Sequence, residues 1–167
     1  MKPSVTVRRY RDGDREACRP LWNELTEWHR RIYGDPTIGG DQPEHFFDDH
    51  LAKVGPDYLW VAVHKSRVVG LIGLIEKGVE GEIEPLIVTE DCRGLGIGAR
   101  LLATGLEAAR SRGIKILEIN PVARNTRTIE WLYERGFRTL GQIQLFIDLT
   151  GHPWKRGPRL YGHQFDF

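Results

Sequence analysis

The chain has 167 residues, 40% of them hydrophobic, and its 24 basic residues nearly balance its 23 acidic ones, for a formal net charge of +1. This length suits one globular domain with a sizeable core, so we expect residues 1–167 to form a single domain. So small a net charge creates no overall field that would draw the chain onto nucleic acid or an acidic membrane. We therefore expect neither as a partner.

Cysteine content and apolar runs indicate the compartment. Cys18 and Cys92 are too few for a disulfide framework and lack metal-type spacing, and the six histidines show no H-x-x-H pattern, so we expect no metal site. The opening "MKPSVTVRRYRDGDRE" lacks the apolar run of a secretion signal, and no segment approaches the ~20 apolar residues that span a bilayer. These features predict a soluble cytoplasmic protein.

The first third of the chain predicts one strand and two helices. Residues 4–10 alternate as in a strand, and residues 14–33 carry apolar side chains at three- and four-residue intervals, as one helix face requires. The glycine- and proline-rich "GDPTIGGDQPE" predicts a loop, and residues 45–54 predict a short helix.

The middle of the chain changes to a period of two. Residues 58–65, 67–78 and 80–91 are apolar runs rich in β-branched residues, joined at Lys65-Ser66 and at residues 78–81. Such runs separated by short turns are typical of an antiparallel meander.

The remaining segments complete an α/β fold. We expect a helix over residues 98–112, a strand over 114–122, a helix over 125–137, and two strands over 141–149 and 159–167. A helix between consecutive strands indicates a parallel pair with a right-handed crossover. The sequence thus predicts a mixed sheet of about seven mostly antiparallel strands, with a parallel central pair and about four helices.

The loop "RGLGIGA", residues 93–99, places three glycines at alternate positions before a helix. Bare backbone N–H groups followed by a helix N-terminus form a nest for an anion such as a phosphate. No Gly-Lys-Ser/Thr follows, which excludes a Walker loop. Gly94, Gly96 and Ala99, with Glu118 beyond them, satisfy a dinucleotide-binding pattern, but the antiparallel strands before the loop argue against it.

The pattern R-x-x-G-x-G from Arg93 to Gly98, with "EPLIVTED" before it and Asn125 and "WLYERGF" after it, resembles the GNAT superfamily of N-acetyltransferases. The resemblance covers nearly the whole chain and implies acetyl-CoA as the acetyl donor. It implies that the pyrophosphate binds the backbone N–H groups of the loop, at Arg93, Gly94, Leu95, Gly96, Ile97, Gly98 and Ala99. Charge-assisted bonds from backbone donors suit a pyrophosphate.

Acetyl transfer to an amine needs a base for the amine and a proton for the leaving thiolate. Glu84 lies inside the apolar run "IEPLIV", and Glu118 lies in mid-strand in "ILEIN". The family resemblance implies a glutamate base on one of these strands, so Glu84 is the first candidate and Glu118 the second. Tyr133 matches the family's proton donor.

Pro85 predicts a bulge or splay in the strand over residues 80–91, because a proline forfeits a ladder hydrogen bond. The resemblance implies that the pantetheine arm of the cofactor enters through this splay and pairs with the backbone at Leu86, Ile87 and Val88. Asn125 caps the last helix by its chemistry, and the resemblance adds a contact with the pantetheine.

Several alternatives stay open. Cys92 beside the loop raises a ping-pong mechanism, which is disfavoured because no histidine is near it in sequence. The acceptor amine is not identified, and the side chains expected to face it are Trp28, His29, Tyr33, Asp35, Asp41, Trp154 and Lys155. A homodimer is possible. The alternative to an enzyme is an inactive acyl-CoA-binding regulatory or interaction module.

Overall fold

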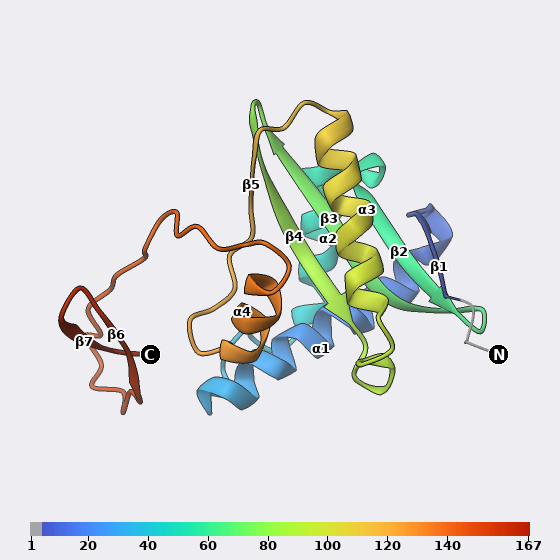
Figure 1. The fold of residues 1–167 in the computed structure, drawn as a ribbon. Helices are drawn as coiled ribbons and strands as arrows, with labels where there is room; N and C mark the ends of the chain where they lie inside the picture. The colour runs from blue at the N-terminus through green and yellow to red at the C-terminus, as the bar shows by residue number, and fades with distance from the viewer. Residues whose placement is uncertain (1–4) are drawn as a thin grey trace. The chain divides into compact units, whose positions relative to one another are not determined.

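The structure, a computed structural model, describes residues 5–167, so Ser4 of the first expected strand lies outside the described residues. Its contacts form two compact units, the first ending at Ile119 and the second running Asn120–Phe167 (Figure 1). The elements of the first unit are β1 (Val5–Arg9), α1 (Arg15–Tyr33), α2 (Phe46–Val54), β2 (Leu59–His64), β3 (Arg67–Lys77), β4 (Glu80–Val88), α3 (Ile97–Ser111) and β5 (Ile116–Glu118).

The five strands of the first unit form one mixed sheet in the order β1-β2-β3-β4-β5. Neighbours pair antiparallel except β4 and β5, which pair parallel across the α3 crossover. The expected parallel pair is therefore present, at the edge of this sheet. β5 is shorter than the expected strand over residues 114–122.

Side chains of the sheet alternate between two hydrophobic clusters. Trp60 and Ala62 join the α3-side cluster, which includes Leu101 and Ala109, while Val61 joins the α1/α2-side cluster. Helices thus cover both faces of the sheet, α3 on one and α1 with α2 on the other (Figure 1). The α1/α2-side cluster contains Tyr10, Cys18, Leu21, Phe47, Leu59, Val61, Leu71 and Ile87.

β4 carries the bulge that Pro85 predicts. Leu74 pairs with Ile83 and Ile72 with Leu86, so one residue of β3, Gly73, faces two residues of β4, Glu84 and Pro85. A Cβ at Gly73 would lie 2.2 Å from the carbonyl oxygen of Glu84, which explains the glycine. Because the bulge adds one residue, Ile83 and Leu86 both contact the α3-side cluster, while Ile87 joins the α1/α2-side cluster.

The second unit contains α4 (Thr126–Tyr133) and a hairpin of β6 (Arg156–Leu160) and β7 (His163–Asp166). The hairpin turns at Tyr161 and Gly162, both at positive φ, within the region expected to be one strand over residues 159–167. The prediction of a strand over residues 141–149 is wrong, because this segment forms no regular structure. A period-two pattern makes a strand only where a neighbouring strand supplies hydrogen bonds.

The α/β fold class with four α-helices is confirmed. Residues 5–167 form seven strands, five in the mixed sheet and two in the hairpin of the second unit. The seventh comes from the division of residues 156–166 into two strands, not from residues 141–149.

Candidate active site

β4 and β5 separate beside the bulge. Their parallel pairing covers only Glu80–Glu82 of β4 and ends at Glu118 of β5. Beyond the bulge, Thr89 N donates to Val69 O at 2.9 Å, and this register turns the backbone groups of Leu86 and Val88 away from β3. In the described sheet no strand pairs with β4 on this side after Glu82. Apart from the Val88 carbonyl oxygen, which accepts from Arg93 Nε, the backbone groups of Leu86 and Val88 therefore have no partner within this sheet.

The glycine loop presents a helix start without a side-chain cap. Gly94 and Gly96 have φ of +80° and +78°, and Gly96 is the N-cap residue of α3. The first helical bond runs from Arg100 N to Gly96 O, so the N–H groups of Ile97, Gly98 and Ala99 have no acceptor within the helix. These donors and the helix dipole favour an anion at this position.

Arg93 is held at the entrance of this loop. Its Nε donates to the carbonyl oxygen of Val88 at 3.0 Å, and its guanidinium lies 5.4 Å from the ring centroid of Trp28 on α1. Arg31 contacts the same ring at 5.3 Å. The bond to Val88 uses Nε, which leaves the Nη groups as the part of Arg93 suited to a phosphate.

Helix α1 also anchors the short 3₁₀ turn Glu90–Cys92 that precedes the glycine loop. Glu24 accepts hydrogen bonds from Thr89 Oγ1 at 2.7 Å and from Glu90 N at 3.0 Å. Arg31 pairs with the Glu90 carboxylate at 3.1 Å. These contacts fix the end of β4 to α1. Sequence reasoning missed Glu24, because nothing in the local pattern links it to residues 65 positions away.

Glu84 lies at the bulge. Alternation from Ile83 directs its side chain to the α1/α2 face, where it is half-buried. His50 on α2 adjoins the Glu84 backbone and is 6% exposed. Burial lowers the pKa of His50, while a backbone hydrogen bond with Glu84 acts in the opposite direction. A neutral imidazole therefore lies beside the strand position of the first base candidate.

Glu118 lies in a three-strand ion network. Lys77 of β3 contacts Glu118 at 2.8 Å and Glu82 of β4 at 2.7 Å. Hydrogen bonds to these two carboxylates raise the pKa of Lys77. Glu82 and Glu118 are the last pair of the β4–β5 ladder, so this network lies where the two strands begin to separate.

The second unit carries the remaining two expected site residues. Asn125 is buried and its side chain accepts from Thr128 N, so the expected cap of α4 is present. Tyr133 ends the same helix with 56% of its surface exposed, and Arg138 lies 5.2 Å from its ring centroid. The two residues lie at opposite ends of α4, about 12 Å apart along its axis.

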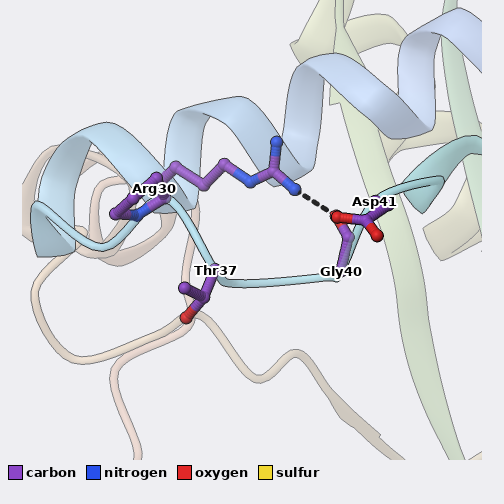
Figure 2. Close-up of a pocket in the computed structure, with 5 residues that line it drawn as sticks. Arg30, Thr37, Gly40 and Asp41 are labelled. Carbon is purple, nitrogen blue, oxygen red and sulfur yellow. Dashed lines mark hydrogen bonds between the residues drawn. The ribbon is translucent and has the colours of Figure 1, made fainter.

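The expected acceptor side contains a hollow of about 380 Å³ between α1 and the loop that follows it (Figure 2). Its lining residues are Arg30, Pro36, Thr37, Gly40 and Asp41. Arg30 donates to the carbonyl oxygens of Ile38 and Gly40, which holds the loop against the helix. Of the other expected acceptor residues, His29 is half-buried, and burial lowers its pKa.

Cys92 is buried, and its sulfur lies 3.4 Å from Nη2 of Arg67. Cys92 and His64 both line a hollow of about 420 Å³. The Nδ1 atom of His64 has no hydrogen-bond partner among residues 5–167. The neighbour found for the thiol is therefore a guanidinium. A guanidinium cannot accept the thiol proton, so this contact supplies no base for a ping-pong mechanism.

None of the helices within residues 5–167 is long and apolar enough to cross a membrane. Within the same range, no three or more side chains of the metal-ligating types His, Cys, Asp and Glu gather as a metal site would require.

The sequence profile of the acetyltransferase (GNAT) family matches residues 22–137. An uncharacterised N-acetyltransferase of Methanocaldococcus jannaschii is 38% identical over 94 residues, which cover 52% of this chain and 42% of that relative. The chain thus matches less than half the length of this curated relative.

Two solved structures share the fold. A GNAT-family acetyltransferase of Staphylococcus aureus superposes with a TM-score of 0.69 and 15% identity over 83% of this chain and 87% of that one. The PaiA N-acetyltransferase of Thermoplasma acidophilum, in complex with coenzyme A, superposes with a TM-score of 0.67 and 17% identity over 80% of this chain and 89% of that one. Together with the profile match over most of its length, these similarities show that the chain belongs to the acetyltransferase (GNAT) family.

Proposed function

We propose that this chain is an N-acetyltransferase that moves the acetyl group of acetyl-CoA to a primary amine by direct attack, as one domain over residues 1–167. The observation that carries the proposal is the open backbone of β4 beside an uncapped helix start. The first suits an extended amide-bearing arm and the second suits a pyrophosphate. The coenzyme A found in the PaiA structure of the same fold supports this assignment.

Each expected site residue has its own role in proton transfer or in cofactor binding. Glu84 takes a proton from the attacking amine, and a backbone N–H at Leu86 or Val88 donates to the carbonyl oxygen as the tetrahedral centre forms. The C–S bond then breaks, Tyr133 gives its proton to the departing thiolate, and the nitrogen loses its second proton to solvent, from which Tyr133 is reprotonated. Asn125 contacts the pantetheine arm, and the loop residues 93–99 hold the pyrophosphate. Glu118 is the second candidate for the base.

The acceptor is an amine that carries a positive charge before it reacts. The Asp41 carboxylate suits a cationic group, and it lines the hollow between α1 and its following loop. The free thiols of Cys18 and Cys92 fit a reducing compartment such as the cytoplasm.

One experiment separates this function from its alternatives. Thermal unfolding is measured with acetyl-CoA, CoA and NAD, and thiol release from acetyl-CoA is followed over a panel of peptide α-amines, lysine, polyamines and aminoglycosides. Stabilisation by CoA with thiol release on at least one amine is the expected result. Stabilisation by CoA without turnover on any amine would favour an inactive acyl-CoA-binding module. Stabilisation by NAD alone would overturn the proposal.

A further inference from the structure

Trp28 on α1 has two arginine side chains over its ring. The guanidinium carbon of Arg93, at the entrance of the glycine loop, lies 5.4 Å from the ring centroid, and that of Arg31 lies 5.3 Å from it. At both distances a cation and an aromatic face attract each other. Because like charges repel, a ring that already faces two cations is a poor site for a third. Trp28 is therefore better explained as a partner of these arginines than as a contact of a cationic acceptor.

Trp28 belongs to one side of α1, which faces the end of β4 and the turn after it. Glu24, Trp28 and Arg31 recur at intervals of four and three residues, which places them on the same side of the helix. Glu24 accepts hydrogen bonds from Thr89 Oγ1 at 2.7 Å and from Glu90 N at 3.0 Å. Arg31 pairs with the Glu90 carboxylate at 3.1 Å. These contacts fix the helix beside the turn, and with it the place of the Trp28 ring.

The two arginines differ in their charge partners. Arg31 donates to the Glu90 carboxylate, and this hydrogen bond lowers the pKa of Glu90. Among residues 5–167 no ion pair is found for Arg93, whose guanidinium group contacts the Val88 carbonyl oxygen and the Trp28 ring. A carbonyl group and a neutral ring hold a guanidinium without cancelling its charge. Arg93 therefore keeps its full attraction for an anion.

The contacts of Arg93 also fix its orientation before a ligand arrives. A free arginine side chain samples many rotamers and loses this freedom when it contacts a ligand, which weakens binding. The bond from Nε to Val88 holds one edge of Arg93, and the Trp28 ring lies against its guanidinium group. A side chain that is already ordered loses less entropy on binding, so the same contact gives a higher affinity.

We propose that Trp28 is a positioning residue for the cofactor: its ring holds the guanidinium group of Arg93 at the entrance of the glycine loop, oriented for the pyrophosphate of CoA. Trp28 acts through Arg93 and touches no phosphate itself. This inference rests on the proposed function, because it requires that the loop binds CoA. It gives α1 a part in cofactor binding, in addition to its place beside the expected acceptor hollow.

The first test measures the affinity of the full chain for CoA by calorimetry. Trp28→Leu should weaken CoA binding by about fivefold or more, and Trp28→Phe, which keeps an aromatic face, should recover most of the affinity. The matched control is Tyr58→Leu, which removes a ring 4.2 Å from the guanidinium carbon of Arg112, at the opposite end of α3. It should leave CoA affinity unchanged. Far-ultraviolet circular dichroism checks that each variant is folded.

The second test shows whether Trp28 acts through Arg93. A variant that combines Trp28→Leu with Arg93→Met should bind CoA as tightly as Arg93→Met alone, whereas a general structural loss at Trp28 would add to the loss at Arg93. Fluorinated tryptophan, incorporated in place of tryptophan, weakens the attraction of the ring for a cation with little change in its size. It should lower the CoA affinity of the unaltered chain but not that of Trp28→Phe, and this comparison does not need a folded Trp28→Leu variant.

The outcomes separate this role from the proposed function. A chain that binds no CoA would overturn both. CoA affinity that is unchanged in a folded Trp28→Leu variant, additive losses in the combined variant, or equal effects of fluorination in the unaltered chain and in Trp28→Phe would each overturn the role of Trp28 and leave the proposed function in place.

Discussion

The Lys77 ammonium nitrogen lies 2.8 Å from a carboxylate oxygen of Glu118 and 2.7 Å from one of Glu82. The ion pair engages the Glu118 carboxylate with the ammonium group of Lys77. Among residues 5–167 no ion pair is found for Glu84, which lies at the bulge on the α1/α2 face. Because Glu118 is paired with Lys77 and Glu84 is not, we favour Glu84 as the base.

The base assignment predicts the pH dependence of kcat/KM. Glu84→Gln should remove the acidic limb of the profile, and its deficit should shrink at high pH, where more of the acceptor amine is already neutral. Glu118→Gln is the matched control and should keep the limb. Its stability should change by less than about 1 kcal/mol, because the pair with Lys77 is partly exposed. If Glu118→Gln loses the limb and Glu84→Gln keeps it, the two roles are reversed.

The proton donor is tested with Tyr133→Phe. If Tyr133 protonates the thiolate, kcat should fall by about 10²-fold or more with little change in CoA affinity, because the hydroxyl acts in the transition state. Steady-state kinetics and calorimetric CoA binding measure the two effects separately. Tyr161→Phe, at a tyrosine that is 78% exposed on the β6–β7 turn, should change neither. Equal losses of CoA affinity and kcat would instead indicate a binding role.

The glycine loop is tested with Gly96→Val against Gly113→Val. Both glycines have positive φ, +78° and +75°, with no atom within 4 Å of an added Cβ, and they lie at opposite ends of α3. Each variant should lose about 1–2 kcal/mol of stability, because a side chain disfavours the left-handed region. Only Gly96→Val should weaken CoA binding. Unchanged affinity in that folded variant would mean that the loop is only a turn.

Gly73 is predicted to be the position of β3 least tolerant of a methyl group. In Gly73→Ala the new Cβ meets the backbone oxygen of Glu84, which cannot move without shifting the bulge. The free energy of unfolding should fall by about 1–3 kcal/mol in denaturant melts. Gly13→Ala, where no atom lies within 4 Å of the added Cβ, is the control and should change stability little. A stable Gly73→Ala variant with full CoA affinity would contradict this role of the glycine.

Because His50 is buried, we expect the protein to lose stability at mildly acidic pH. Burial holds the pKa of His50 below its ordinary value, so the unfolded chain takes up a proton below about pH 6.5 that the folded chain does not. The free energy of unfolding should therefore fall as pH decreases from 7 to 5.5, by up to about 1.4 kcal/mol per unit for one histidine. His29, whose pKa burial also lowers, adds a contribution of the same sign.

The contribution of His50 is isolated by substitution. His50→Gln should give a shallower fall of stability between pH 7 and 5.5, while the exposed His163→Gln should leave the slope unchanged. The measurement is chemical unfolding at closely spaced pH values. An identical slope in His50→Gln would show that this ring gains its proton in the folded state.

Local pattern was sufficient for most of the first unit. The expected helix over residues 14–33 is observed as Arg15–Tyr33, and the strand over 67–78 as Arg67–Lys77, because each carries a continuous apolar period and a clear stop. The bulge could be predicted from Pro85, because a proline cannot donate a hydrogen bond to the neighbouring strand. The turn at Tyr161-Gly162 could also have been found, since a glycine between two short alternating runs is a hairpin signal.

The failures share one cause, which is dependence on residues distant in sequence. Residues 141–149 have the pattern of a strand but no neighbouring strand in the structure. The contacts of Lys77 with Glu118 and of Glu24 with Thr89 join parts of the chain that no local period connects. The residues named for the cofactor in the first unit, by contrast, all lie within residues 86–99, at the end of one strand and in the loop that follows it.

The bulge makes β4 one residue longer than its ladder with β3 requires. If Pro85 were absent, Glu84 would stand opposite Gly73, Ile83 and Leu86 would still face α3, and Ile87 would still face α1 and α2. Both hydrophobic clusters could therefore form around a shorter, regular strand. Neither cluster therefore depends on the additional residue, and a variant that lacks Pro85 would test separately whether the chain folds and whether it binds CoA.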